Sequence, residues 1–484
     1  MRAQLTSITS IAASTPQADS AERVLTRAQG AVLITVLASV AAGLVIAPAT
    51  AAFMVVAAAT MLFFVVFAVR ALISAQGLAA PSEAHGLRAK RIADADLPRY
   101  SILLPLFREA EILPRLIRTI RGIDYPLQKL QVLLLIEGDD RATLACAKEM
   151  QLPPQFEIVP IEASLPRTKP KACNVGLARV TAPYCVIYDA EDRPEPDQLR
   201  KAVATFAAVH ESVVCLQARL QHWNAMTNLL TRFFAAEYAA FFDIALPGLA
   251  RLRMPIPLGG TSNHFATSAL RQLGGWDSYN VTEDIDIGMR IARSGQRAEI
   301  LDSVTWEEAN SAVGNWIRQR SRWIKGHIQT YFVHMRSPRQ LATDLGMKNF
   351  VAFQIIVGAT PLVLLISPVF WVVMALWMVT KASSIQALYP APILYLATLT
   401  LFFGNLTFVY YAMTGCIARG QYSSVKLMAL CPLYWALMSV AAWKGVAQLV
   451  YRPHYWEKTD HGLVMEADVT GELPSSLSAS GSSA

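Results

Sequence analysis

Acidic side chains follow directly after a short apolar run near the middle of the chain. The run Tyr184–Tyr188 is rich in β-forming residues. Three carboxylates come next, at Asp189, Glu191 and Asp192, before two prolines prevent the strand from continuing. Side chains two residues apart on an extended segment point the same way, so Asp189 and Glu191 suit a hard divalent cation that also binds phosphate oxygens. Taken alone, the segment is equally typical of a solvated turn.

Further carboxylates follow other predicted strands. Glu109 lies just after the apolar segment Ser101–Leu106, and Glu137 and Asp139 follow the apolar segment Gln131–Ile136. The carboxyl ends of parallel strands meet at one edge of a sheet, where open α/β sheets bind their ligands. This coincidence favours an acidic ligand site over a solvated turn.

Two later motifs also contain side chains that could take part in a reaction. Thr282-Glu283-Asp284 precedes an amphipathic helical segment, so Asp284 is either a helix cap or a general base held at a helix start. Gln319-Arg320-Ser321-Arg322-Trp323 puts cations beside a large aromatic plane, a pattern that is also typical of an anchor at a membrane interface. The Gly-rich segment Leu258–His264 could line a substrate pocket, but it lacks the spacing of a P-loop or a dinucleotide-binding fingerprint.

The composition indicates a membrane protein. Hydrophobic residues make up 54% of the chain and charged residues only 16%, which is too apolar for an ordinary soluble protein. The net charge of +7 comes without a Lys/Arg tract, which argues against a nucleic-acid partner and fits a basic cytoplasmic face. The six cysteines contain no CxxC pair, so neither a zinc site nor a disulfide framework is indicated.

The first part of the chain predicts a tail and a membrane anchor. Residues 1–27 are expected to form a disordered tail, and the apolar run starts too late, after Arg23, for a signal peptide. Residues 28–75 contain two apolar stretches separated near Pro48, each close to the ~20 residues that a bilayer requires. Basic residues before and after the pair place both its ends on the cytoplasmic side. We therefore expect a transmembrane hairpin.

Residues 95–340 are predicted to form a soluble α/β domain. Apolar β-rich segments alternate with helical segments, which indicates a doubly wound parallel sheet with a ligand crevice at its carboxyl edge. The aromatic helical segment Trp223–Leu246 is either plain core or an amphipathic element in the membrane interface, and the flanking anchors favour the interface. The expected strands are Ser101–Leu106, Gln131–Ile136, Phe156–Pro160 and Tyr184–Tyr188, and the expected helices are Glu109–Ile120, Lys171–Ala178 and Ile287–Ser294.

A second membrane region is expected over residues 345–451. Phe350–Ile366 and Ile393–Tyr411 are apolar enough to cross, whereas Phe370–Val379 is too short to span by itself. Met428–Val450 is a last span, a re-entrant hairpin or an interfacial pair, which gives four to six crossings in all. Residues 452–484 are expected to form a cytoplasmic tail with a disordered end, and the role of its Trp-Glu-Lys-Thr segment is not derivable from the sequence.

The ordered set of motifs resembles the processive family 2 glycosyltransferases. This group includes the catalytic subunits of cellulose, hyaluronan, chitin and poly-N-acetylglucosamine synthases, and the resemblance spans residues 98–335. It implies an α/β GT-A fold (Rossmann-like, nucleotide-diphospho-sugar transferase) in a cytoplasmic domain flanked by α-helical transmembrane segments, in the inner membrane of a bacterium. The motifs that carry it are Pro105–Glu109, Glu137–Asp140, Asp189–Glu191, Thr282–Asp284 and Gln319–Trp323.

The resemblance also implies a role for individual residues. Asp284 corresponds to the catalytic base, and Asp189 and Glu191 correspond to the DxD pair that binds Mg²⁺ or Mn²⁺, with Asp192 as an alternative ligand. The acceptor would contact Glu283, Gln319 and Trp323. The second motif departs from the usual Asp-Asp-Gly-Ser, so its nucleotide-contacting carboxylate could shift by a residue or two. The implied ligands of the nucleotide-sugar are Glu109, Glu137, Asp139, Lys171, Asn174, Asp189, Arg320 and Arg322.

The implied activity is an inverting transfer of a sugar from a nucleotide-sugar, such as UDP-glucose or UDP-N-acetylglucosamine, to a growing β-linked polysaccharide that is secreted. Accessory secretion subunits are candidate partners. A second hypothesis is a non-processive enzyme that adds one sugar to a lipid carrier or lipid acceptor. A third is a membrane transporter or sensor whose cytoplasmic domain binds a nucleotide without catalysis. The sequence does not identify the sugar, because related sugars differ by single substituents that spacing does not reveal.

Overall fold

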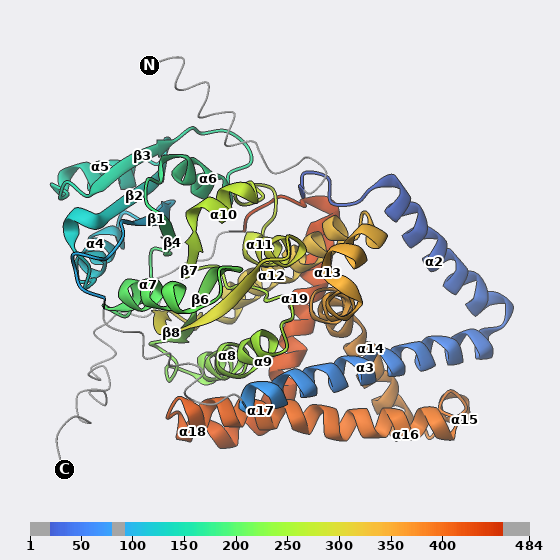
Figure 1. Ribbon diagram of the computed structural model, residues 1–484. Helices are drawn as coiled ribbons and strands as arrows, with labels where there is room; N and C mark the ends of the chain where they lie inside the picture. Colours follow the sequence, from blue (N-terminus) through green and yellow to red (C-terminus); the bar gives the residue numbers. More distant parts are fainter. Residues whose placement is uncertain (1–19, 80–91, 458–484) are drawn as a thin grey trace, which may run out of the picture.

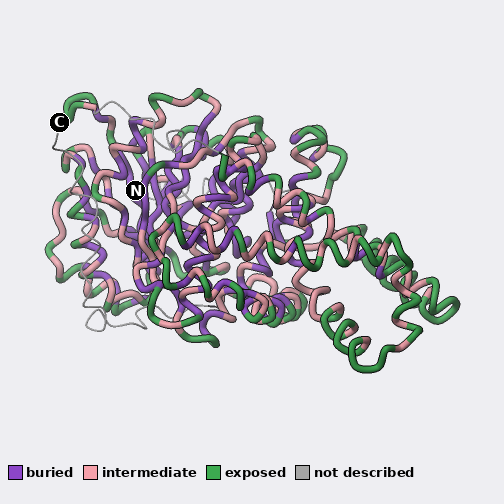
Figure 2. Tube along the Cα trace, turned by 90° about the horizontal axis from the view of Figure 1, so that it is seen from below, coloured by how far each residue is buried: buried purple, intermediate pink, exposed green. Residues whose placement is uncertain are grey.

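A mixed eight-stranded sheet lies at the centre of the molecule, and long helices extend from one side of it (Figure 1). The computed structural model describes residues 20–79 and 92–457. The tails expected at 1–27 and 452–484 therefore fall largely outside the described residues. Figure 2 shows that the buried residues gather in the sheet and its covering helices, while the projecting helical part is mostly exposed.

The sheet combines a parallel half with a mixed half. Its strand order is β3-β2-β1-β4-β7-β6-β8-β5, and the first four strands run parallel to one another. The predicted strands are all present within a residue or two. The bounds are β1 Tyr100–Leu106, β2 Leu130–Glu137, β3 Phe156–Ile161, β4 Tyr184–Ile187, β5 Arg193–Pro194, β6 Val213–His222, β7 Asn263–Ala266 and β8 Arg297–Glu307.

The expectation of a parallel sheet throughout is wrong for its second half. Strand β7 runs antiparallel between β4 and β6, and β5 runs antiparallel to β8. β7 follows the Gly-rich segment Leu258–Ser262, at the end of the long connection that leaves β6 at His222. The predicted Gly-rich turn therefore leads directly into a strand.

Apolar cores cover both faces of the parallel half. On β2, Val132 and Leu134 belong to one core, and Leu133 and Leu135 belong to the other. Burial on both faces explains why these strands read as continuous apolar runs rather than as alternating patterns. The helices of the domain are α4 Leu113–Arg121, α5 Arg141–Glu149, α6 Lys169–Arg179, α7 Gln198–Ala208, α10 Thr267–Gln272, α11 Glu283–Arg293 and α12 Val313–His334, with a 3₁₀ turn η3 at Leu127–Lys129.

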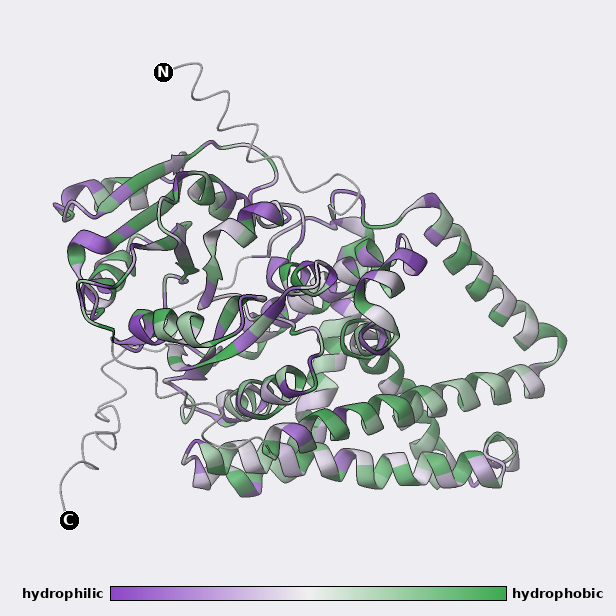
Figure 3. Ribbon diagram, in the orientation of Figure 1, coloured by the Kyte–Doolittle hydropathy of each residue, from purple (hydrophilic) through white to green (hydrophobic). Residues whose placement is uncertain are grey.

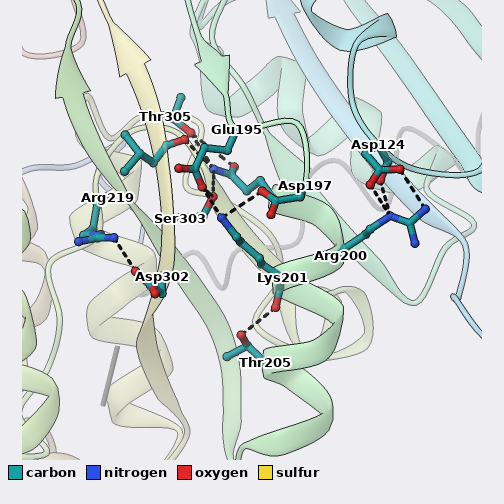
Figure 4. A network of polar contacts seen from close by, with 12 residues as sticks. Asp124, Glu195, Asp197, Arg200, Lys201, Thr205, Arg219, Asp302, Ser303 and Thr305 are labelled. Carbon is teal, nitrogen blue, oxygen red and sulfur yellow. Dashed lines mark hydrogen bonds and ion pairs between the residues drawn. The ribbon is translucent and has the colours of Figure 1, made fainter. Parts of the chain in front are cut away.

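A polar network anchors the loop after β4 on the side that faces β8 and α7 (Figure 4). Glu195 accepts a hydrogen bond from Ser303 Oγ at 2.8 Å and pairs with Lys201 Nζ at 2.6 Å. Arg200 donates to Asp124 from Nη2 at 3.0 Å. These contacts fix the proline-containing segment against β8 and α7, so the acidic loop has a defined position at the sheet edge.

Six helical stretches in the described residues are long and apolar enough to cross a membrane by length and composition. The N-terminal pair is α2 Arg27–Ile46 and α3 Pro48–Leu78, which break at Ala47 as predicted. Figure 3 shows that these projecting helices are predominantly hydrophobic. The others are Leu229–Arg251, Pro338–Thr380, Ala391–Ala418 and Tyr422–Tyr451.

The C-terminal helices differ in two ways from the expected spans. Phe370–Val379 is no separate piece, because a helix continues through Pro368; proline is tolerated in membrane helices where neighbours re-satisfy the freed carbonyl. The last helix, α19, packs along α12 and contacts the domain through Tyr434 near its start, whereas Gln448 near its end donates to Glu457 of the C-terminal segment. The bounds are α13 Pro338–Phe353, η5 Gln354–Ala359, α14 Thr360–Thr380, α15 Ser383–Gln386, α16 Ala391–Leu399, η6 Thr400–Gly404, α17 Asn405–Ala418, α18 Tyr422–Val425, η7 Lys426–Leu430 and α19 Cys431–Tyr451.

The aromatic segment expected as one helix from Trp223 to Leu246 is divided. Strand β6 runs to His222, and the helical part begins at Leu229, with α8 Leu229–Ala239, a π-helical turn η4 Ala240–Ala245 and α9 Leu246–Arg251. Phe234 and Phe242 are buried between the sheet and the apolar helices α3 and α17. The layer formed by α8, η4 and α9 therefore joins the domain to the projecting helices.

Candidate active site

Most of the predicted site residues line one cavity of about 1900 Å³ at the carboxyl edge of the sheet. The cavity continues from this edge between the apolar helices. Its predicted members are Glu109, Glu137, Asp189, Glu191, Glu283, Asp284, Gln319, Arg320, Arg322 and Trp323. Asp139, Lys171 and Asn174 are not among the lining residues.

The three carboxylates after β4 occupy different environments. Asp192 is 2% exposed and accepts hydrogen bonds from the backbone N–H of Asp189 at 2.7 Å and from the Thr261 hydroxyl. Burial and the neighbouring charges of Asp189 and Glu191 raise its pKa well above the usual range. Asp192 thus shapes the loop, which weakens its alternative role as a metal ligand, while Asp189 and Glu191 line the cavity.

Lys169, at the start of α6, is the lysine that reaches the acidic loop. Its ammonium contacts the Asp189 carboxylate and donates to the Gly260 carbonyl at 2.6 Å. Lys171 donates instead to the carbonyls of Glu162 at 2.7 Å and Ser164 at 2.6 Å. Two residues on a helix are turned about 200° apart, so only one of these lysines can face the site. The Lys-Pro-Lys segment is the sequence signal for both lysines, and Lys169 rather than the predicted Lys171 lines the cavity.

Asn174 has a positioning contact in the domain core. Its amide donates to the Trp276 carbonyl at 2.7 Å and accepts from the Trp276 N–H at 2.9 Å. The side chain is 7% exposed. Asn174 therefore ties α6 to the loop before α11 and does not reach the cavity.

The carboxylates at the end of β2 also lie in different environments. Glu137 lines the cavity with one carboxylate oxygen buried and, among the described residues, without a hydrogen-bond partner. Burial raises its pKa, against the lowering effect of the nearby Lys171 and Arg167. Asp139 pairs with Arg167 at 2.7 Å at the surface, and Asp140 caps α5 by accepting from the Thr143 N–H. Of the two predicted carboxylates after β2, only Glu137 is aimed at the cavity.

Asp284 lies in the first turn of α11 and faces the Gly-rich segment. A Cβ built on Gly260 would lie 3.5 Å from its Oδ2 atom, so the backbone of that segment forms one wall beside the carboxylate. Burial raises the pKa of Asp284 to about 6, against the lowering effect of the Ile285 N–H and of Lys169. Burial and the charge of Asp284 raise the pKa of Glu283 to about 8. A carboxylate with the pKa of Asp284 is suited to general-base chemistry near neutral pH.

The Gln-Arg-Ser-Arg-Trp motif lies on α12, which packs directly on the start of α11. A Cβ on Gly326 would lie 2.3 Å from the Thr282 side chain. Gln319 and Trp323, one turn apart, both line the cavity. Burial lowers the pKa of Arg322, against the raising effect of the nearby charges of Glu283, Asp189 and Asp284. Its guanidinium also lies 4.4 Å from the Trp456 ring centroid.

Arg320 is turned away from the acidic loop. It donates two hydrogen bonds to the Glu237 carboxylate, at 2.7 and 2.6 Å, and one to the Tyr434 hydroxyl at 3.2 Å. Its side chain is 4% exposed. Because Arg320 and Arg322 lie two residues apart on one helix, they face opposite sides of it. Arg320 is therefore engaged with α8 and α19 and not with the acidic loop, contrary to its predicted place beside the donor.

A C-terminal strap, Arg452–Glu457, packs on the face of α12 that carries Arg322, lines part of the cavity through Tyr455 and Trp456, and was not predicted. The carbonyls of Pro453, Tyr455 and Glu457 accept hydrogen bonds from Gln329 at 3.0 Å, Lys325 at 2.7 Å and Arg322 at 3.3 Å. Alternate carbonyls of an extended segment thus match donors three and four residues apart on one helix face. The only sequence signal was the Trp-Glu-Lys-Thr segment, of which residues beyond Glu457 lie outside the described range.

The residues around the acidic loop fit a divalent cation bound together with a diphosphate. Several carboxylates lie close together, since burial and the charges of Asp192, Glu191 and Asp189 raise the pKa of the cavity-lining Glu307 well above its usual range. In residues 20–79 and 92–457, no three His, Cys, Asp or Glu side chains are grouped to hold a metal by themselves. One or two carboxylates completed by substrate phosphates and water are the ligand set typical of Mg²⁺.

The comparisons with known proteins agree with this geometry. A family described as "Glycosyltransferase like family 2" matches residues 98–326, just under half of the chain. The Beta-monoglucosyldiacylglycerol synthase of Synechocystis sp. is 26% identical over 431 residues, which is 82% of this chain and 83% of that protein. "Probable glycosyltransferase YdaM" of Bacillus subtilis is 24% identical over 237 residues, which is 48% of this chain and 56% of that protein.

Among solved structures, the mannosyltransferase PcManGT from Pyrobaculum calidifontis, in complex with GDP-Man and Mn²⁺, is 18% identical, with a TM-score of 0.48. The match covers 83% of this chain and 99% of that structure. The family match and the mixed Rossmann-like sheet, with acidic residues at its carboxyl edge, agree on the fold and the enzyme class. The apolar helices associate the chain with a membrane. Residues 98–326 therefore form a domain of the glycosyltransferase family 2 type with a Rossmann-like mixed sheet, and the enzyme class that they indicate is a glycosyltransferase.

Proposed function

We propose that the protein transfers a hexose from a nucleotide-sugar, UDP-glucose or UDP-N-acetylglucosamine, to a growing β-linked glycan that leaves through the apolar helices. The observation that supports this proposal is that the cavity extends from the domain to the far end of the apolar helices. Its lining includes Asp284 in the domain, Thr360 in α14, and Gln386 and Tyr389 at the far end of the helical layer. Figure 1 places α15 remote from the sheet. A long acceptor could occupy such a space from the reaction centre to the opposite end.

The donor would bind at the carboxyl edge of the sheet. Asp189 and Glu191 would hold Mg²⁺ or Mn²⁺, which when bound neutralises charge on the diphosphate leaving group. Glu109 and Glu137 would lie beside the nucleoside, with Asp139, Lys171 and Asn174 outside the cavity wall. Lys169 and Arg322 are the cations nearest the acidic residues, so they would stabilise the negative charge that develops on the leaving group.

The transfer step would be a single displacement. The acceptor hydroxyl attacks the anomeric carbon, its proton passes to the Asp284 carboxylate, and the bond to the nucleoside diphosphate breaks. One displacement inverts the anomeric configuration, so an α-linked donor gives a β-linked product. Glu283, Gln319 and Trp323 would contact the acceptor, because an indole plane suits the apolar face of a pyranose ring.

A second candidate function is the addition of one sugar to a lipid acceptor. The cavity wall between the helices is mainly apolar, with side chains such as Phe63, Val66 and Leu364. Such a wall accommodates acyl chains as readily as a glycan. The similarity to a protein named Beta-monoglucosyldiacylglycerol synthase, over most of both chains, supports this candidate as well.

The proposed arrangement places residues 95–340 in the cytoplasm and residues 28–75 and 345–451 in the inner membrane of a bacterium. Basic residues at the domain-side ends of the apolar helices support this orientation. Accessory secretion subunits remain part of the proposal for a polymer product, and a nucleic-acid partner does not.

The first test is turnover of the purified protein in nanodiscs. UDP- and GDP-sugars are supplied with Mg²⁺ or Mn²⁺, with and without dioleoylglycerol, while nucleotide release and product size are followed together; EDTA and D284N serve as negative controls. A long product from one donor supports polymer synthesis. A single-sugar product formed only with dioleoylglycerol supports the lipid acceptor. Nucleotide binding without turnover under any condition would contradict both and favour a non-catalytic sensor.

A further inference from the structure

The guanidinium of Arg320 is buried in an ionic cluster where three elements meet, and the Glu237 side chain of this cluster is 33% exposed. Both of its terminal nitrogens are bonded to the Glu237 carboxylate of α8. The Tyr434 hydroxyl of α19 donates to the same carboxylate at 2.6 Å and accepts from Arg320 at 3.2 Å. A bidentate pair closed by a third hydrogen bond holds the guanidinium in one place and in one plane.

Arg320 in turn fixes the indole of Trp323. Its guanidinium carbon lies 4.6 Å from the centroid of that ring, 4.3 Å from the Phe234 centroid and 5.2 Å from the Trp316 centroid. Cations at such distances from aromatic faces are attracted to them. The Tyr238 ring, with an interplanar angle of 26° and a centroid distance of 6.5 Å, flanks the same indole. Arg320 thus attracts the indole through its charge, and Tyr238 packs beside it.

We propose that Glu237 and Tyr434 are positioning residues for the acceptor, acting through Arg320 on the plane of Trp323. The inference rests on the proposed function, in which Trp323 contacts the acceptor beside Asp284 in the same cavity. It assigns Arg320 to the acceptor side of the site. Since α8 belongs to the layer that joins the domain to the apolar helices and α19 packs along α12, these two helices set the orientation of the Trp323 indole.

Removing the charge of Glu237 should have a selective effect. In E237Q the side chain keeps its size, but the buried guanidinium of Arg320 loses its counter-charge and its fixed plane. The Michaelis constant for the acceptor is expected to rise about tenfold, while the Michaelis constant for the donor and the rate of donor hydrolysis by water stay unchanged. Y434F, which removes only the hydroxyl, should show the same selectivity with a smaller rise.

A matched control exists in the same layer. Asp243, in η4, forms a bidentate pair with Arg419 of α17, with distances of 2.6 and 3.1 Å, and touches neither Arg320 nor Trp323 in the contacts of the described chain. D243N therefore removes a comparable buried ion pair between this layer and an apolar helix. It is expected to leave the ratio of the two Michaelis constants as in the wild type.

The experiment measures transfer and hydrolysis in parallel, in nanodiscs, with the donor that turns over and with cellotetraose, chitotetraose or dioleoylglycerol as acceptor. A selective rise in the acceptor constant for E237Q and Y434F, absent in D243N, supports the inference. Equal losses on donor and acceptor sides, or the same change in D243N, would overturn it. Should E237Q fail to accumulate in the membrane, the Y434F result decides. A wild type that transfers to no acceptor would instead contradict the proposed function itself.

Discussion

Carboxylates of equal charge perform different tasks around this cavity because their surroundings differ. Asp192 is enclosed and hydrogen-bonded within its own loop, Asp189 pairs with a lysine, and Asp284 lies beside a glycine backbone with a pKa raised to about 6. Burial and neighbouring charge, rather than residue type, thus separate a structural carboxylate from candidates for metal binding and catalysis.

The raised pKa of Asp284 predicts the acid limb of the pH profile. Below about pH 6 the carboxyl group carries a proton and cannot accept another, so transfer should fall about tenfold per pH unit as the pH drops. Steady-state rates at saturating metal would show this limb. D284N should lower transfer about a thousandfold and leave UDP binding by calorimetry unchanged. A variant that still transfers, or a wild type with a flat profile through this range, would remove Asp284 as the base.

The two lysines at the start of α6 offer a paired test. K169A removes the cation that contacts Asp189, so turnover should fall about a hundredfold. K171A removes a side chain bonded to loop carbonyls, so turnover should change by about threefold or less. Initial rates of nucleotide release at several donor concentrations measure both. The opposite order of effects would restore Lys171 as the donor-binding lysine.

At the scale of elements, the direction in which each side chain leaves its helix explains why α12 contacts several different partners. On α12, Arg322 and Lys325 face the C-terminal strap, whereas Arg320 faces α8. Residues three or four apart share a face, and residues two apart do not. The motif therefore places Arg322 toward the strap and the acidic loop, and Arg320 toward α8 and α19.

Helix α3 crosses α9 through backbone contact, and this crossing joins the α2–α3 pair to the domain. A Cβ on Gly248 would lie 2.0 Å from the Ile73 carbonyl oxygen, and one on Gly77 would lie 1.8 Å from the Ile244 carbonyl oxygen. Small residues at such crossings allow close packing of helices in a membrane. G248A should therefore force the helices apart.

The expected cost of G248A is about 1–3 kcal/mol of stability, the range for overpacking. A lower melting temperature of the purified protein in detergent, followed by tryptophan fluorescence, would show it. G30A is the control, because a Cβ on Gly30 of α2 would meet nothing within 4 Å. Identical melting of G248A and G30A would indicate that the crossing is less tight than the backbone distances imply.

At the scale of the whole molecule, the cavity couples the reaction site to the far end of the helical layer. Lining residues come from the sheet edge, from α3, α12 and α14, and from the turn around α15. No element alone encloses this space. The membrane part is therefore expected to guide the product as well as to anchor the domain.

This coupling predicts where the product goes. In proteoliposomes with the glycosyltransferase domain outside and the donor added outside, a glycan that leaves through the cavity should accumulate inside the vesicle. It would then resist a glycosidase added outside until detergent is supplied. Sizing of the product before and after detergent makes the measurement. A product digested at once by external enzyme would contradict passage, and a product that partitions into organic solvent would support the lipid acceptor.

Several features could be predicted from the sequence because they depend on local patterns. The break at Pro48, the buried strands of the parallel half and the order of the acidic motifs all follow from residue type and spacing. Carboxylates at the ends of strands such as β2 and β4 must gather at one edge once those strands run parallel, and Glu137, Asp189 and Glu191 all line the cavity there.

The remaining features required the tertiary structure. Whether Lys169 or Lys171, and whether Arg320 or Arg322, faces the acidic loop depends on how α6 and α12 are rotated against their neighbours, which a motif does not record. The antiparallel entry of β7, the partners Glu237 and Tyr434, and the strap on α12 join segments dozens to hundreds of residues apart. Such contacts are selected by packing of the whole chain, because no local propensity distinguishes one distant partner from another.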